Sequence, residues 1–156
     1  MPMDRLRLLA VDNDDLDIFS AHCQDAIVRL GDCRYRRVEK QFAVEMNRFA
    51  WETAQKRKFS VFAAPKYERR RSALHFDRVT GVRRQGLDTA KDDQILVLLA
   101  IRFTETSSPS GHIDLLFAGG ATIRLEVEVV EAQLADVGAA WSTEAKPDHD
   151  RTDVEL

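Results

Sequence analysis

The amino-acid sequence predicts one α+β domain built around an antiparallel sheet. Three observations support this fold class: a helical pattern of apolar residues near the N-terminus, a long central series of alternating patterns, and a second helical pattern near the C-terminus. The chain has 156 residues, of which 44% are hydrophobic and 31% are charged. These values are typical of a single folded domain and argue against general disorder.

The first predicted elements are a short apolar strand over residues 6–11 and a helix over residues 15–25. The acidic cluster between them offers Asn13 or Asp14 as a helix N-cap. Four apolar side chains then recur at helical spacing, namely Leu16, Phe19, Cys23 and Ala26. This spacing predicts an amphipathic helix with one side facing a core.

From residue 26 onward, apolar residues alternate with polar ones, which is the pattern of strands with one buried face. Turn residues predict hairpins at Gly31-Asp32 and at Gly119-Gly120. Residues 94–103 are apolar on both faces, so we expect a central strand that is covered on both sides. The pattern predicts about seven strands, near residues 27–30, 33–38, 42–47, 74–77, 94–103, 113–117 and 123–127.

A second helix is predicted over residues 128–137, with Gly138 as its C-cap and an apolar stripe of Val130, Leu134 and Val137. We therefore expect a rolled antiparallel sheet with an N-terminal and a C-terminal helix, similar in element order to a pleckstrin-homology domain. A flat sheet with both helices on one face fits the element order almost as well. The domain would span residues 3–142, followed by a flexible polar tail over residues 143–156.

The formal net charge is only −3, so overall charge does not favour nucleic acid or an anionic membrane. The charge is uneven, however: residues 53–72 carry seven basic and one acidic residue, and residues 99–156 carry four basic and eleven acidic residues. No stretch is apolar and long enough for a signal peptide or a membrane span. Cys23 and Cys33 lack the spacing of a zinc site or a redox pair. We therefore expect a cytoplasmic protein with reduced thiols and with neither a metal nor a cofactor.

The most distinctive feature is a basic segment in the long loop predicted over residues 50–71. Its aromatic residues stand among cations, a combination that can contact an acidic protein surface or stack on the bases of RNA. The simpler interpretation is a solvated loop whose cations balance the acidic C-terminal region. The candidate binding residues are Lys56, Arg57, Lys58, Phe59, Phe62, Arg69, Arg70 and Arg71.

A second candidate site is a pocket near His75, Asp77 and Arg78. His75 and Asp77 are two residues apart on a predicted strand, so their side chains share a face, and a carboxylate beside an imidazole is the pairing of a general base. An outward polar pair on an amphipathic strand explains the same spacing. The residue types of a hydrolase triad occur within residues 20–25, but adjacent helical residues point apart.

Several segments together carry a family resemblance. They read LRLLA (6–10), SAHCQDA (20–26), NRF followed by WE (47–52), RRRSALHFDRV (69–79), FAGG with IRL (117–125) and EAQLADVG with Trp141 (131–141). This combination resembles a bacterial family of unknown function, DUF2948, over residues 3–149. The resemblance implies a stand-alone cytoplasmic domain and supplies no activity.

We expect a non-enzymatic interaction module that uses the basic loop, because no nucleophile–base pair, metal cluster or phosphate loop stands out in the sequence. A protein partner is favoured over RNA, since the overall charge is negative. The alternatives are an RNA-binding module that uses the same loop, and an enzyme or small-ligand-binding protein with a pocket near His75 and Asp77. Self-association through the oppositely charged segments is a further alternative.

Overall fold

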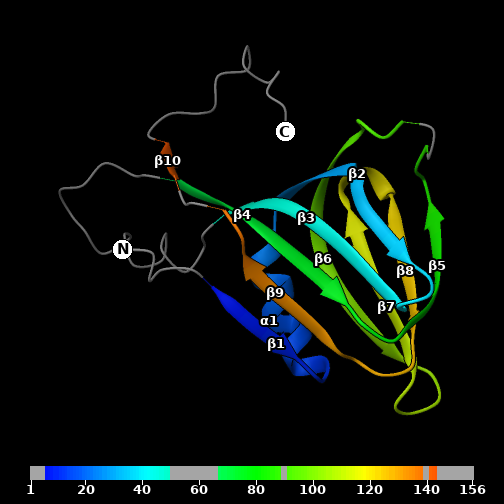
Figure 1. Ribbon diagram of the computed structural model, residues 1–156. Coiled ribbons are helices and arrows are strands. Elements are labelled where there is room, and N and C mark those ends of the chain that lie inside the picture. Colours follow the sequence, from blue (N-terminus) through cyan, green and yellow to red (C-terminus); the bar gives the residue numbers. More distant parts are fainter. Residues whose placement is uncertain (1–5, 50–66, 89–90, 139–140, 144–156) are drawn as a thin grey trace.

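The computed structural model describes residues 6–49, 67–88, 91–138 and 141–143, and it shows one antiparallel sheet with a single α-helix among them (Figure 1). The sheet has ten strands, all paired antiparallel. The elements are β1 Arg7–Ala10, α1 Asn13–Cys23, β2 Ala26–Arg36, β3 Gln41–Phe49, β4 Tyr67–Phe76, β5 Val79–Gln85, β6 Ile95–Glu105, β7 Gly111–Phe117, the 3-10 turn η2 Ala118–Gly120, β8 Thr122–Val127, β9 Ala132–Asp136 and β10 Trp141–Thr143.

The strand order brings distant parts of the chain together. Across the sheet the order is β1-β9-β4-β3-β2-β6-β7-β8-β5, and β10 pairs with β4. The two outermost strands, β1 and β5, are therefore separated by the whole width of the sheet. The sheet curves strongly, and the start of β5 returns to the turn between β2 and β3 (Figure 1). There the Val79 N–H donates to the Lys40 carbonyl at 2.9 Å, and the Tyr35 hydroxyl donates to the Val79 carbonyl at 3.0 Å.

One continuous apolar core fills the inner side of this curved sheet. Alternate residues of the central strands point inward, as the period of two predicts, so that β3 buries Phe42, Val44 and Met46 while β4 buries Leu74 and Phe76. Each buried side chain of this size stabilises the fold by roughly 1.5–3 kcal/mol. The inner face is therefore the main source of stability.

Helix α1 begins where the sequence provides an N-cap. Asp12 is extended, and its carboxylate accepts a hydrogen bond from the Asp15 N–H at 2.8 Å. In return, Asp15 accepts a hydrogen bond from the Val11 N–H at 2.9 Å. The helix buries Leu16, Phe19 and Cys23 in the core, and it packs mainly against β6 and also against β1 and β3.

The predicted fold class is wrong in its helix count and strand count. The described residues form ten strands and one α-helix instead of about seven strands and two helices, and the predicted C-terminal helix over 128–137 of the pleckstrin-homology-like arrangement is not present among them. Residues 132–136 form β9 rather than a helix, because both sides of this segment are paired, with β1 and with β4. Val130 and Leu134 are buried, a spacing that a helix and a strand both allow.

Two further strand predictions are corrected. The predicted hairpin at Gly31-Asp32 is the interior of one continuous strand, β2, whose pairing with β3 shifts register between Val28 and Cys33. Strand β6 lies near the middle of the sheet as predicted, but its outer face is not covered. Ile95 and Leu99 on that strand are nearly half exposed, at 46% and 45%.

A candidate binding groove between α1 and β6

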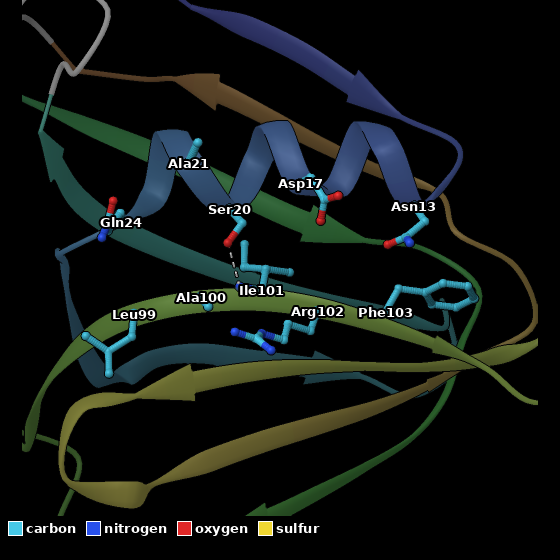
Figure 2. Close-up of a pocket in the computed structure, with 10 residues that line it drawn as sticks. All are labelled: Asn13, Asp17, Ser20, Ala21, Gln24, Leu99, Ala100, Ile101, Arg102 and Phe103. Carbon is cyan, nitrogen blue, oxygen red and sulfur yellow. Dashed lines mark hydrogen bonds between the residues drawn. The ribbon is translucent and has the colours of Figure 1, made fainter.

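A groove of about 500 Å³ lies between helix α1 and strand β6 (Figure 2). Both elements contribute to its lining, and the helix supplies mostly polar groups while the strand supplies mostly apolar ones. The residues that line it are Asn13, Asp17, Ser20 and Ala21 of α1, the C-cap residue Gln24, and Leu99, Ala100, Ile101, Arg102 and Phe103 of β6. A volume of this size is within the usual range of ligand pockets in proteins.

The groove exists because β2 and β6 pair over only part of their lengths. β2 pairs with β6 only over Ile95–Leu98, whereas β7 pairs with β6 from Leu98 to Glu105 on the other side. β2 begins at Ala26, directly after the end of α1, so the helix lies where a strand would otherwise continue. The second half of β6 therefore has a strand on one side and the groove on the other.

One main-chain group on this open side is bound by the helix. The Ile101 N–H donates to the hydroxyl oxygen of Ser20 at 3.0 Å (Figure 2). In a strand, the N–H and C=O groups of alternate residues point to the same side. Phe103 and Glu105 therefore present their N–H and C=O groups to the same side as Ile101, away from β7. A register shift between Leu98 and Ala100 sets this orientation.

The groove contains one carboxylate that is not used in the fold. The ion pairs among the described residues do not include Asp17, whose side chain is exposed and points toward the groove (Figure 2). Asn13 and the ring of Phe103 lie at the same end of the groove. Carboxylate and carboxamide oxygens such as these can accept hydrogen bonds from a cation or an N–H donor. The groove lining holds neither a histidine nor a cysteine.

The arginine cluster of the predicted basic site is spread over both faces of β4. Arg70 points inward and is buried, with its Nη1 3.4 Å from a carboxylate oxygen of Asp136. Arg71 points outward and is bound to Asp32 at 3.2 Å and to Glu45 at 3.1 Å. Arg69 lies 4.0 Å from the centre of the Phe49 ring. The remaining candidates, Lys56, Arg57, Lys58, Phe59 and Phe62, lie outside the described residues.

A buried charged network that no sequence pattern indicates lies beneath this cluster. Arg48 is fully buried and forms a bidentate pair with Asp136, with N···O distances of 3.1 and 3.2 Å. Asp136 also accepts hydrogen bonds from the Ser72 hydroxyl at 2.7 Å and the Leu6 N–H at 2.8 Å. Burial by itself would raise the pKa of Asp136, but the hydrogen bonds from Arg48, Ser72 and Leu6 outweigh it and lower the pKa. Only the pairing of β3, β4 and β9 reveals this network.

His75, Asp77 and Arg78 do not line the groove. The Nδ1 atom of His75 lies 3.4 Å from an Asp77 oxygen, and the Gln41 side-chain amide donates to the other Asp77 oxygen at 3.1 Å. Arg78 turns to the acidic side chains of Glu128 and Glu131, at 3.7 and 3.5 Å. The three residues therefore belong to surface polar pairs, and the pocket prediction at this position stays a prediction.

Both cysteines are buried thiols, and burial raises the pKa of Cys23 and of Cys33 to about 12. Within the described ranges, no group of three or more metal-binding side chains comes together. In the same part of the chain, no helix has the length and apolar character needed to cross a membrane.

The chain was compared with known protein families, curated proteins and solved structures. Residues 6–149 match the family described as "Protein of unknown function (DUF2948)". The chain belongs to the DUF2948 family. The match covers the sheet, the helix and the groove of this DUF2948 protein, and it confirms the resemblance found in the sequence. Comparisons with curated proteins and with solved structures gave no match.

Proposed function

We propose that this DUF2948 protein is a non-enzymatic interaction module that binds a segment of another protein in the groove between α1 and β6. The observation that carries this proposal is the open edge of β6 beside the groove. Unpaired strand edges bind other polypeptides readily, because every second residue offers a main-chain donor and acceptor. Within the ranges that the structure describes, this edge is covered only in part, through the hydrogen bond from the Ile101 N–H to Ser20.

The chemistry of the groove supports binding more than catalysis. Its polar groups are a carboxylate, two carboxamides, a hydroxyl and a guanidinium, contributed by Asp17, Asn13, Gln24, Ser20 and Arg102. The Ser20 hydroxyl oxygen is held by the main chain of β6, and no histidine in the lining could activate it as a nucleophile. These groups are suited to hold a ligand by hydrogen bonds and charge.

An exposed apolar residue next to the groove also supports a protein partner. Leu99 is 45% exposed at the end of the groove nearest Gln24. A partner that covered Leu99 while pairing with the strand edge would combine apolar burial with main-chain hydrogen bonds, which is the usual composition of a small protein interface.

Filling the groove tests the proposal. Asp17→Trp places a large ring where the Asp17 side chain points into the groove, and Ile18→Trp places the same ring on the next residue, which is exposed and does not line the groove. We expect affinity capture from nuclease-treated native lysate to retain a partner with wild type and Ile18→Trp and to lose it with Asp17→Trp. Equal capture by all three proteins would overturn the proposal, and capture that disappears with nuclease would point to RNA instead.

A further inference from the structure

We infer that the segment bound in this groove is extended and carries a lysine or arginine, which it directs at Asp17 while its backbone pairs with β6 at Phe103 and Glu105. This inference rests on the proposed function and names the chemistry of the partner. It follows from the geometry of the open edge and from the charge of the groove.

The free part of the edge begins at Phe103. At Ile101 the N–H group is already bound by Ser20, so helix α1 occupies the position that an added strand would need. Phe103 is the last β6 residue in the groove lining, and Asn13, the first residue of α1, lies beside it (Figure 2). Thr104 and Glu105, which follow on the strand, are exposed. A partner strand can therefore pair with Phe103 and Glu105 and then enter the groove beside the helix.

The groove favours one basic side chain from such a segment. Among the described residues no ion pair includes the Asp17 carboxylate, Asn13 precedes it by four positions on the helix, and the Phe103 ring lies at the Asn13 end of the groove (Figure 2). A carboxylate that points into a groove is a suitable partner for an ammonium or guanidinium group. Arg102 also lines the groove and would repel a second cation. The structure thus favours a segment with a single basic residue among uncharged ones over a polybasic segment.

Selection of peptides tests this inference directly. A display library of short random peptides would be selected separately against the full-length wild type, Asp17→Lys and Asp14→Lys. Asp14 is in the same turn of the helix but is not part of the groove lining, so Asp14→Lys is a matched control. We expect wild type and Asp14→Lys to enrich peptides with one Lys or Arg, and Asp17→Lys to bind those peptides about tenfold more weakly and to enrich peptides with Asp or Glu instead.

Amide hydrogen exchange tests whether the backbone of the peptide pairs with β6. The best selected peptide should slow amide hydrogen exchange at Phe103 and Glu105, and N-methylation of its alternate backbone nitrogens should abolish binding. Selected peptides that bind wild type and not Asp17→Trp would leave the proposed function in place. The inference is overturned if those peptides contain no basic residue, or if they do not protect the amides of Phe103 and Glu105 from exchange. If no peptide is enriched on wild type over Asp17→Trp, the inference and the protein-binding groove both fail.

Discussion

At the scale of single residues, the buried charges of Arg48, Arg70 and Asp136 are the feature that distinguishes this protein from a sheet with an ordinary apolar core. Arg48 and Asp136 are separated by 88 positions in the sequence, yet their side chains are both fully buried and bonded to each other. A buried ion pair is costly to break, because the remaining partner has neither water nor a counter-charge. Asp136 is the residue on which two arginines converge.

Asp136→Ala should therefore destabilise the protein strongly. We expect a loss of about 3–5 kcal/mol in the free energy of unfolding, because Arg48 and Arg70 would lose their shared carboxylate. Glu45→Ala, which breaks an exposed ion pair with Arg71, should cost about 1 kcal/mol or less. Urea unfolding of the two variants measures both values, and equal losses would contradict this account of the network.

The same network should make stability depend on acid pH. The pKa of Asp136 is lowered in the folded protein, so its contribution is fully present above the unfolded-state pKa of about 4 and is lost as the pH falls through the folded pKa. Wild type should thus lose stability steeply below about pH 4. Asp136→Asn should show a smaller decline over that range, and urea unfolding at a series of pH values compares the two slopes. Parallel slopes would show that other carboxylates are responsible.

The two thiols should be inert in the folded protein. Burial raises the pKa of Cys23 and Cys33 to about 12, so the thiolate fraction near pH 8 is lower than in an unfolded chain by a factor on the order of a thousand. We expect iodoacetamide to leave both residues unmodified under native conditions and to modify both in urea, as mass spectrometry would show. Rapid native modification of either cysteine would mean that its site opens frequently.

At the scale of elements, the candidate site depends on a mismatch between neighbouring strands. The sequence predicts the helix closely, over 15–25 against the observed Asn13–Cys23, because its cap and apolar spacing are local signals. It also predicts a strand near the observed β6. Neither pattern indicates that β2 would begin only opposite Leu98 and leave the rest of β6 without this neighbour, since strand pairing depends on residues far apart in the chain.

The packing of β6 against β7 also fixes the free end of the groove. A Cβ atom added at Gly111 would lie 2.7 Å from Cε1 of the Phe103 ring and would clash with the Thr104 carbonyl oxygen. Gly111→Ala should therefore shift β6 and cost roughly 1–3 kcal/mol of stability. Gly81→Ala in β5 is the control, because its nearest neighbour would be the Glu126 Cγ at 3.7 Å, an ordinary contact. Thermal unfolding of both variants would contradict this expectation if their losses were similar.

At the scale of the whole molecule, strand β9 from the C-terminal part of the chain pairs with β1 from the N-terminal part. This strand lies between β1 and β4, so it connects the first strand to the centre of the sheet. It also supplies Asp136, which binds residues of β3 and β4. A segment predicted as a peripheral helix is therefore an interior strand.

A chain that ends at Val130 should consequently fail to fold cooperatively. It would lack β9, so β1 would lose the strand that it pairs with and the buried arginines would lose Asp136. A chain that ends at Thr143 keeps all ten strands and is the control. We expect a sigmoidal urea transition for the longer chain and a gradual one for the shorter, followed by circular dichroism. A sharp transition for the shorter chain would show that the sheet forms without β9.

The sequence by itself determined the antiparallel character of the sheet, the N-terminal helix with its acidic cap, and the membership of the family, because propensity, periodicity and motifs are properties of short segments. Tertiary structure decided the rest. It turned residues 132–136 into a strand by giving them partners on both sides, and it separated Arg70 and Arg71 onto opposite faces of β4. It also placed an open strand edge beside the helix. These outcomes depend on which distant strands pair and in what register, and that choice is made by the burial of the whole core.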